Sequence, residues 1–512
     1  MGNTVILGNE KLTLENFVNV VRHRQTVRIA EEAYLRIEKS RIYVEKLIED
    51  SKVIYGLTTG FGKFSDIVIS KDETSDLQRN LIVSHSCGVG EPFSEEIVRG
   101  ILLLRINNLI IGNSGIRRVT VDKMVEILNS DVFPVIPEKG SLGASGDLAP
   151  LSHMVLVVLG MGEAFYKGQR MSGAEALSRA GIKPLEFLSS KEGLALINGT
   201  QAMTSVGALA VYEAIILMKT LDITAAVTME ALNGITCAYD EKIHKIRGHK
   251  GQIDSASNIL RILDGSRMTT KQGQLRVQDP YTLRCTPQIH GASKDAINFV
   301  LNKVEIEMNA VTDNPIIFPD QEQVISGGNF HGQPMALPFD FLGIACSEMG
   351  NISERRLERL VNPQLNFGLP AFLTPHGGLH SGFMIVQYSA AALVSENKVL
   401  AHPASVDSIP SSGNQEDHVS MGTIAARKGY EILKNSRKAI AMELLAACQG
   451  VDLRGNSGLG RGTAAAYGIV RKYVTKLEDD RVMYLDINTV EKLIADGEIV
   501  RAVESVIGEI KV

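Results

Sequence analysis

The chain of 512 residues is long enough to bury a large core and to form more than one domain. Its formal net charge of −5, with acidic and basic residues mixed along the chain, excludes the basic stripe of a nucleic-acid-binding or membrane-surface protein. Five cysteines without a CxxC pair exclude a disulfide framework and a zinc cluster, and they fit reduced thiols in a cytoplasm.

The N-terminal stretch "MGNTVILGNEKLTLENF" lacks the basic segment and apolar run of a secretory signal. No apolar run reaches the roughly 18 residues of a membrane helix, so we expect a soluble, cytoplasmic protein. Thr13 is a predicted helix N-cap, because Phe17, Val20 and Val21 follow it at helical spacing.

Helical periodicity dominates the rest of the chain. The segment 206–233 is apolar almost all round, which is typical of a helix at the centre of a bundle or at a subunit interface. The segments 288–312 and 420–448 each carry one apolar stripe at helical spacing. The sequence therefore predicts a mainly α protein, with a loop-rich N-terminal part over 1–205 and a long-helix bundle over 206–512.

The stretch "GSLGASGDLAP" at 140–150 gathers small residues in the middle of the N-terminal part. It is not a nucleophile elbow, because the pattern G-x-S-x-G is broken by Asp147. One interpretation is a simple tight turn. In the other, the amide nitrogen of Gly146 closes a ring on the carbonyl carbon of Ala144, and Ser145 loses water to leave an electrophilic methylidene-imidazolone.

A metal site is a weaker hypothesis. His376 and His380 are four residues apart, as in a helical metal-ligand pair. The two glycines between them disfavour a helix and no carboxylate accompanies them, so we expect a loop and no metal.

Seven segments in order along the chain resemble the aromatic amino acid ammonia-lyases. The 140–153 stretch is similar to their prosthetic-group loop. The others are "YGLTTGFG" (55–62), "LQRNLIVSHSCGVGEP" (77–92), "GLALINGTQ" (193–201), "QDPYTLRC" (278–285), "GGNFHG" (327–332) and "NQEDHVSMG" (414–422).

The resemblance implies a catalytic group and its helpers. Ala144, Ser145 and Gly146 would form 4-methylidene-imidazol-5-one (MIO), with no metal or nucleotide required. Tyr55 would act as the base at the substrate β-carbon from a loop over 55–65 that closes over substrate. Such a phenol can act as a base only if its pKa is lowered or its proton is passed on quickly.

Further site residues follow from the same resemblance. Tyr281 would lie beside the electrophile, and Glu416 would accept an imidazole N–H or relay protons. The substrate-binding positions would be Ser84, His85, Asn198, Gln278, Arg284 and Phe330. Among these, Arg284 suits a bidentate clamp on the substrate carboxylate.

The substrate choice rests on the pair Ser84-His85. By resemblance, members that act on phenylalanine have Phe-Leu here, those that act on tyrosine have His-Leu, and those that act on histidine have Ser-His. His85 can hydrogen-bond an imidazole ring, which a leucine could not. The resemblance thus implies conversion of L-histidine to trans-urocanate and ammonia, the first step of histidine degradation.

Alternatives remain at this point. A tyrosine or phenylalanine ammonia-lyase or an aminomutase of the same family is one, and a helical scaffold with a degenerate site is another. Some positions depart from the family pattern, namely Thr58, Thr286, His290 and Gln333. The family forms homotetramers with active sites shared between subunits, and we expect 206–233 and 420–448 to form the interface, with no nucleic-acid or membrane partner.

Overall fold

The computed structural model describes residues 4–50, 52–54, 56, 57, 59, 60, 62, 69 and 73–512. These divide into two compact units, of which the first holds residues up to 209, 301–340 and 403–427, and the second 210–300, 341–402 and 428–512. The expected division at 205/206 lacked the two later segments of the first unit. Tyr55 and Thr58 lie outside the described residues.

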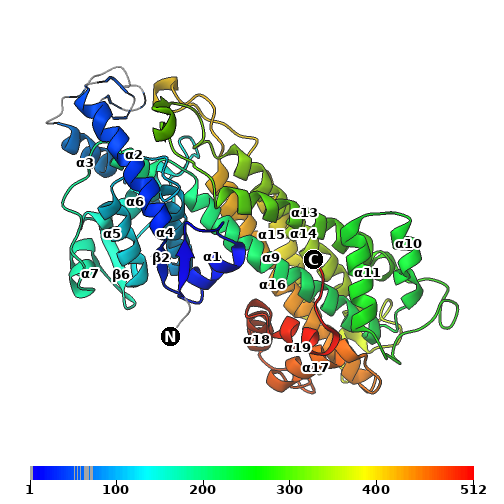
Figure 1. The fold of residues 1–512 in the computed structure, drawn as a ribbon. Coiled ribbons are helices and arrows are strands. Elements are labelled where there is room, and N and C mark those ends of the chain that lie inside the picture. The colour runs from blue at the N-terminus through cyan, green and yellow to red at the C-terminus, as the bar shows by residue number, and fades with distance from the viewer. Residues whose placement is uncertain are drawn as a thin grey trace. The chain divides into compact units, whose positions relative to one another are not determined.

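The first unit is built mainly from helices of moderate length (Figure 1). Thr13 caps the first of them, because its hydroxyl oxygen accepts the backbone N–H of Asn16 at 3.1 Å, as the sequence predicts. The helices are α1 (Leu14–Val21), α2 (Glu31–Glu49), α3 (Thr74–His85), α4 (Glu95–Leu109), α5 (Arg118–Asn129), α6 (Leu148–Val158), α7 (Gly173–Arg179) and α8 (Glu192–Ile197).

The strands of this unit are three or four residues long and form small separate sheets. A parallel pair joins β1 (Val5–Leu7) and β2 (Val27–Ile29). The antiparallel sheets are β3 (Val89–Pro92) with β5 (Pro137–Lys139), β4 (Val132–Pro134) with β6 (Glu163–Tyr166) and β7 (Gln169–Ser172), and β8 (Ile316–Phe318) with β9 (Gln323–Ile325).

Four long helices contribute residues to both units: α9 (Gln201–Ala231), α13 (Thr286–Glu307), α14 (Gln333–Val361) and α16 (Gly422–Leu453). The second unit adds α10 (Glu241–Lys245), α11 (Lys250–Ile262), α12 (Tyr281–Arg284), α15 (Met384–Leu400), α17 (Arg461–Tyr473), α18 (Met483–Ala495) and α19 (Glu498–Ile507). Short 3-10 turns lie at Thr236–Tyr239, Pro319–Gln321, Ala371–Leu373 and Ser412–Asn414. The predicted mainly α fold is confirmed.

The apolar segment 206–233 is covered within its own chain. None of its residues is exposed, so packing within its own chain accounts for its apolar breadth, and its expected place in a subunit interface stays a prediction. The 420–448 segment is also mostly buried. Large exposed apolar side chains lie instead on α13, α14 and α15: Phe299, Ile306, Leu337, Phe341, Ile344, Ile385, Tyr388 and Val399.

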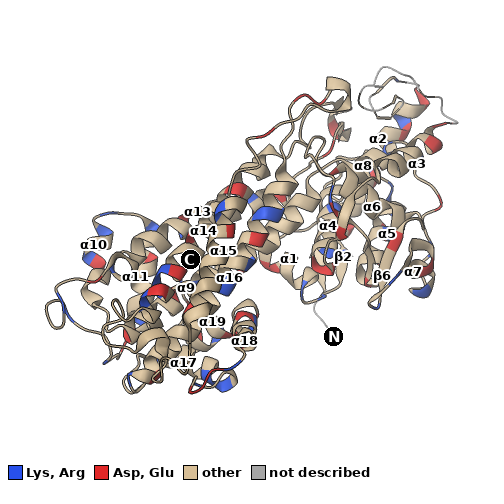
Figure 2. Cartoon of the chain, turned by 180° about the vertical axis from the view of Figure 1, so that it is seen from behind, with Lys and Arg blue, Asp and Glu red and all other residues tan. Residues whose placement is uncertain are grey.

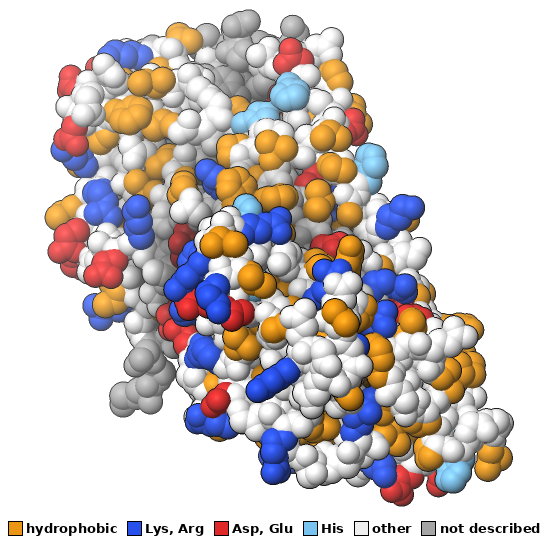
Figure 3. Space-filling model, turned by 90° about the vertical axis from the view of Figure 1, so that its right-hand side faces the viewer, with side chains coloured by type: hydrophobic (Ala, Val, Ile, Leu, Met, Phe, Trp, Pro, Cys, Tyr) orange, Lys and Arg blue, Asp and Glu red, His pale blue; other side chains and the backbone are white. Residues whose placement is uncertain are grey.

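Charges of both signs are mixed over the described surface. Figure 2 shows blue and red residues interspersed along the helices, and in Figure 3 hydrophobic side chains lie among charges of both signs. Among the described residues, no helix combines the length and apolarity needed to cross a bilayer. The mixed charge agrees with the absence of a basic stripe in the sequence.

Candidate active site

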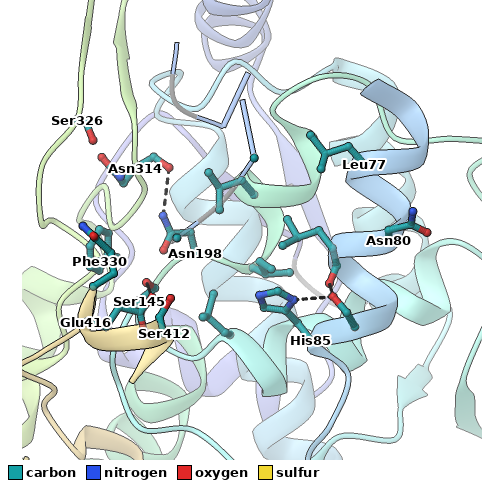
Figure 4. A pocket seen from close by; sticks show the side chains of 18 of the residues that line it. Leu77, Asn80, His85, Ser145, Asn198, Asn314, Ser326, Phe330, Ser412 and Glu416 are labelled. Carbon is teal, nitrogen blue, oxygen red and sulfur yellow. Dashed lines mark hydrogen bonds between the residues drawn. The ribbon is translucent and has the colours of Figure 1, made fainter. Parts of the chain in front are cut away.

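The first unit contains a cavity of about 1170 Å³. Its wall combines α3, the Ser145 turn, the end of α8, the segment 314–330 and the loop 412–416. In Figure 4, His85, Leu77 and Asn80 of α3 face Ser145, Asn198, Glu416 and Phe330 across this space. Six residues predicted from the sequence therefore line one cavity: Ser84, His85, Ser145, Asn198, Phe330 and Glu416.

The turn at Ser145 packs directly on a second backbone segment. Gly146 has φ +76°, and a Cβ there would overlap the carbonyl of Gly199. The two glycines form an isolated parallel bridge, in which Gly199 N–H donates to the Ser145 carbonyl at 3.3 Å and Asp147 N–H donates to the Gly199 carbonyl at 2.7 Å. Only glycine fits at 146, because both the positive φ and the close approach exclude a side chain.

The side chain of Asp147 holds this turn in place. Its fully buried carboxylate accepts hydrogen bonds from Ser141 Oγ at 2.8 Å, from the backbone N–H of Met203 at 2.9 Å and from Thr423 Oγ1. Burial raises the pKa of this carboxyl above its usual value, and the hydrogen bonds oppose that rise. The carboxylate thus ties the start of α6 to the starts of α9 and α16, which are positive dipole ends that favour negative charge.

Ser145 points toward a carboxylate. Its hydroxyl donates to Oε1 of Glu416 at 3.1 Å, and Oε2 of the same carboxylate accepts from Ser411 Oγ at 3.2 Å. Two backbone hydrogen bonds between Ser411 and Glu416 fix the loop that carries the carboxylate. Glu416 can therefore exchange a proton or accept an N–H directly beside the Ser145 side chain.

Asn198 offers an unused acceptor to the cavity. Its side-chain nitrogen donates to the carbonyl of Asn314 at 3.1 Å. Asn198 is only 2% exposed, so its Oδ1 is shielded from solvent. This oxygen nevertheless has no hydrogen-bond partner among the described residues. Because buried polar atoms are normally paired, this oxygen indicates a ligand donor in the cavity.

His85 ends α3 on the opposite wall. Its Nδ1 and the Ser84 hydroxyl are 3.0 Å apart, which orients the ring. Burial lowers the pKa of His85 below its usual value of 6.5, and the backbone of Leu81 and the charge of Glu416 oppose the shift. The imidazole is thus neutral at neutral pH, with one nitrogen able to donate and the other to accept.

Three predicted site residues belong to the second unit. Gln278 and Tyr281 are exposed, and Arg284 is half-buried, with its guanidinium carbon 4.5 Å from the centre of the Tyr281 ring. The Arg284 Nε donates to the Asp279 carbonyl at 2.9 Å, which leaves the two Nη groups of the guanidinium to bind a carboxylate. None of the three is among the described residues that line the cavity.

Three of the residues that depart from the family pattern form hydrogen bonds within the chain. Thr286 Oγ1 donates to the Thr282 carbonyl at 3.0 Å, and Gln333 Nε2 donates to the Ser405 carbonyl at 3.3 Å. His290 is fully buried, and burial lowers its pKa to about 4 although Nδ1 lies 2.8 Å from Oδ1 of Asp222. Its neutral ring therefore donates to this carboxylate.

The histidine pair of the second unit lies in a loop. The His376 and His380 rings are 6.3 Å apart, and His380 Nε2 lies 3.3 Å from Asp479 Oδ1. In the part of the chain that the structure describes, no group of three or more His, Cys, Asp or Glu side chains could hold a metal ion. A loop is what the intervening glycines predict.

Sequence reasoning missed two residues that support the site. Asp147 is of a residue type that often precedes a helix, and it stands directly before the apolar run that becomes α6. Arg105 stands alone in the apolar run "ILLLRINNLI" (101–110), and it is fully buried. A single charge in such a run indicates a buried charge with a function, because burying it is costly.

The family follows from comparison with known proteins. A family model described as aromatic amino acid lyase matches residues 12–472. The chain belongs to the aromatic amino acid lyase family. It is 63% identical over 503 residues to a histidine ammonia-lyase of Alkaliphilus oremlandii, across 98% of this chain and 99% of that one.

Solved structures of this family include members with different reactions. The chain is 42% identical to a histidine ammonia-lyase from Trypanosoma cruzi, with a TM-score of 0.92 over 98% of this chain and 95% of that one. It is 39% identical to a tyrosine aminomutase from Streptomyces globisporus, with a TM-score of 0.95 over 98% and 99%. The aromatic amino acid lyase fold is thus shared by enzymes of different activity, and the site must decide the substrate.

The protonation state of His85 can be measured. We expect its imidazole to titrate below 6.5 in nuclear magnetic resonance spectra, because burial disfavours the charged ring. The ring is then neutral above its pKa and gains a proton as the pH falls through that value. The Glu416→Gln variant should titrate lower still, since a negative charge that favours the imidazolium is lost. A midpoint at or above 6.5, or an upward shift in the variant, contradicts this electrostatic account.

Proposed function

We propose that the chain is an ammonia-lyase that converts L-histidine to trans-urocanate and ammonia, the first step of histidine degradation. The observation that carries this proposal is the placement of His85 and Glu416 on opposite sides of one cavity, with Ser145 beside the carboxylate. An imidazole substrate can hydrogen-bond both groups through its two ring nitrogens. The identity to a histidine ammonia-lyase supports the same substrate.

The residues at 144–146 fit the MIO group that the family uses. Gly146 has the positive φ and the lack of space that only glycine tolerates, and the neighbouring Ser145 side chain faces the cavity. The unpaired Oδ1 of Asn198 supplies a buried acceptor on the same wall. When formed from Ala144, Ser145 and Gly146, this group supplies an electrophile that no ordinary side chain provides.

The reaction breaks two bonds of L-histidine. A proton leaves the β-carbon and the α-amine leaves as ammonia, and the electron pair of the C–H bond becomes the double bond of urocanate. We propose Tyr55 as the base at the β-carbon and Glu416 as the group that accepts an imidazole N–H or relays protons. Asn198 would accept a hydrogen bond in the cavity, and Phe330 would pack beside the ring.

Substrate choice depends on His85 and Glu416, which lie on opposite sides of the cavity. A phenyl ring in place of imidazole would leave the His85 nitrogens and the Glu416 carboxylate without ring partners, which disfavours phenylalanine. A tyrosine hydroxyl could pair with His85, so a tyrosine ammonia-lyase or an aminomutase is the second candidate. The similarity to a tyrosine aminomutase keeps that candidate in the test.

We also propose that the working enzyme is a homotetramer whose sites combine residues of different subunits. The described residues that line the cavity include no lysine or arginine, although the substrate carries a carboxylate. Arg284 can supply this cation from another subunit, together with Tyr281 and Gln278. The exposed apolar side chains of α13, α14 and α15 supply the surface that such an assembly covers. We propose that this assembly is soluble and works in the cytoplasm.

The substrate prediction is tested by incubation with single amino acids. L-histidine should give the conjugated ultraviolet absorption of urocanate and an equal amount of ammonia. L-tyrosine and L-phenylalanine should react at least about 100-fold more slowly, because a phenyl ring offers no partner to His85 or Glu416 and a phenol ring offers a partner to His85 alone. Ser145→Ala should lose turnover and keep the helical circular dichroism spectrum. Faster release of ammonia from tyrosine, or formation of a β-amino acid, would instead favour the second candidate.

The shared site is tested by mixing two inactive variants. Ser145→Ala and Arg284→Ala should each be inactive alone, since one lacks the electrophile and the other the carboxylate clamp. Mixed tetramers made by co-expression should regain about one quarter of the activity, because a random site then combines the two intact residues. No regained activity in verified mixed tetramers contradicts a site built from different subunits.

A further inference from the structure

A buried arginine lies behind the Ser145 turn and is not used by the reaction described above. Arg105 is on α4, and its side chain is fully buried. Its Nη1 donates to the Asn198 carbonyl at 2.7 Å and to Gln201 Oε1 at 2.9 Å, while Nη2 donates to Asn108 Oδ1. All three partners are neutral oxygens.

Among the residues that the structure describes, Arg105 has no counter-ion of its own. No carboxylate of the described residues forms an ion pair with it, and Nε has no hydrogen-bond partner among them. Asp313, whose charge acts on Arg105, is itself paired with Lys191 at 2.7 Å. Burial lowers the pKa of Arg105 to about 10, so the guanidinium remains cationic at neutral pH. Burying a cation without a counter-ion costs free energy. Of its hydrogen bonds to Asn198 and Gln201, the shorter joins this cation to the Asn198 carbonyl.

One peptide group connects this charge to Ser145. The Asn198 carbonyl belongs to the same peptide plane as the Gly199 N–H, and that N–H donates to the Ser145 carbonyl at 3.3 Å. The side chains behind this peptide leave no room for a methyl group, since a Cβ on Gly199 would lie 2.8 Å from Arg105 Nη1. Hydrogen bonds in series polarise one another, so the guanidinium strengthens the Gly199 N–H as a donor.

We propose that Arg105 is a positioning residue that acts through the Asn198–Gly199 peptide to draw electron density from the Ser145 carbonyl. This inference rests on the proposed function, because the Ser145 carbonyl is conjugated with the methylidene carbon once that group has formed. The same hydrogen bond assists two steps. It promotes the loss of water from Ser145, and it makes the resulting double bond more electrophilic.

The atoms balance in both dehydrations. In ring closure, the Gly146 nitrogen bonds to the Ala144 carbonyl carbon, and the Ala144 oxygen leaves as water with the hydrogens of the Gly146 and Ser145 nitrogens. In the second step the Ser145 Cα–H bond and the Cβ–Oγ bond break. The Cα–H electron pair passes through an enolate on the Ser145 carbonyl oxygen to form the Cα=Cβ bond. The hydroxyl leaves as water with a proton. The enolate oxygen is the acceptor of the Gly199 N–H, so negative charge develops where Arg105 acts.

The test compares arginines of one helix. Arg105→Met removes the charge, and Arg99→Met is the matched control, since Arg99 is also buried on α4 but donates to Val20, Leu128 and Asp131. Intact mass spectrometry of freshly made protein follows the loss of two waters with time. We expect that loss to be about ten-fold slower in Arg105→Met than in wild type and unchanged in Arg99→Met. Equal rates in wild type and Arg105→Met overturn the proposal, as does equal slowing in the control.

A second readout needs no turnover. In the absence of substrate, 2-mercaptoethanol should add through sulfur to the former Ser145 Cβ, with a solvent proton taken up at Cα. We expect mature Arg105→Met to form this adduct about ten-fold more slowly than wild type. If Arg105→Met does not fold, Arg105→Lys decides the matter. Its adduct rate relative to wild type should fall as the pH rises and the buried ammonium loses its proton. A purely structural role would give a pH-independent ratio.

The outcomes separate this inference from the proposed function. If wild type loses no water, the proposed function fails and the inference fails with it. If wild type loses two waters and converts L-histidine while Arg105→Met matures and reacts with the thiol at the wild-type rate, only the role of Arg105 is wrong.

Discussion

The buried carboxylate of Asp147 is the interaction on which the Ser145 turn depends. Its hydrogen bonds to Ser141, Thr423 and the backbone of Met203 join three parts of the chain that are far apart in sequence. These bonds reinforce the backbone bridge that holds Gly146 against Gly199, where a side chain at 146 would overlap the Gly199 carbonyl. A buried carboxylate that loses its donors is strongly destabilising, so the turn and its supports form together.

The electrostatics of the first unit are directed at the same backbone segment. The starts of α6 and α9 lie at Asp147, whose carboxylate accepts the Met203 N–H at the positive dipole end of α9. Arg105 adds a full charge behind the Asn198–Gly199 peptide, and no carboxylate in the described part of the chain forms an ion pair with it. On the cavity side, Glu416 provides the negative group that meets the Ser145 hydroxyl. This polarity suits a backbone that must lose hydroxide and accept electrons.

Much of this arrangement could be predicted from the sequence, for identifiable reasons. Helical periodicity predicted the apolar stripe of α13, where Ile297, Val300 and Val304 are buried. The Thr13 cap was predictable because capping depends on residues next to each other in the sequence. The residues of the cavity wall were predictable because the motifs that carry His85, Ser145 and Glu416 resemble those of the aromatic amino acid ammonia-lyases. Tyr55 lies outside the described residues, so its role stays a prediction.

The rest depended on tertiary packing. The breadth of the apolar face on α9 does not distinguish a core helix from an interface helix, and only burial within the chain does so. The return of 301–340 and 403–427 to the first unit is a long-range arrangement that no local pattern encodes. Asp147 and Arg105 matter through partners distant in the chain, such as Met203 and Asn198, which single-sequence reasoning could not pair.

The central claim is that the Ser145 turn becomes an electrophile rather than remaining a turn. The most direct measurement is the mass of the purified wild-type protein, followed by proteolysis and mass analysis of the peptide that contains residues 144–146. The account predicts a chain two waters lighter than its sequence, with the whole deficit in that peptide and a deficit of at most one water in Ser145→Ala, which lacks the hydroxyl that the second dehydration removes. A peptide of full mass from a folded protein would contradict the account, because the Ser145 side chain would still carry its hydroxyl.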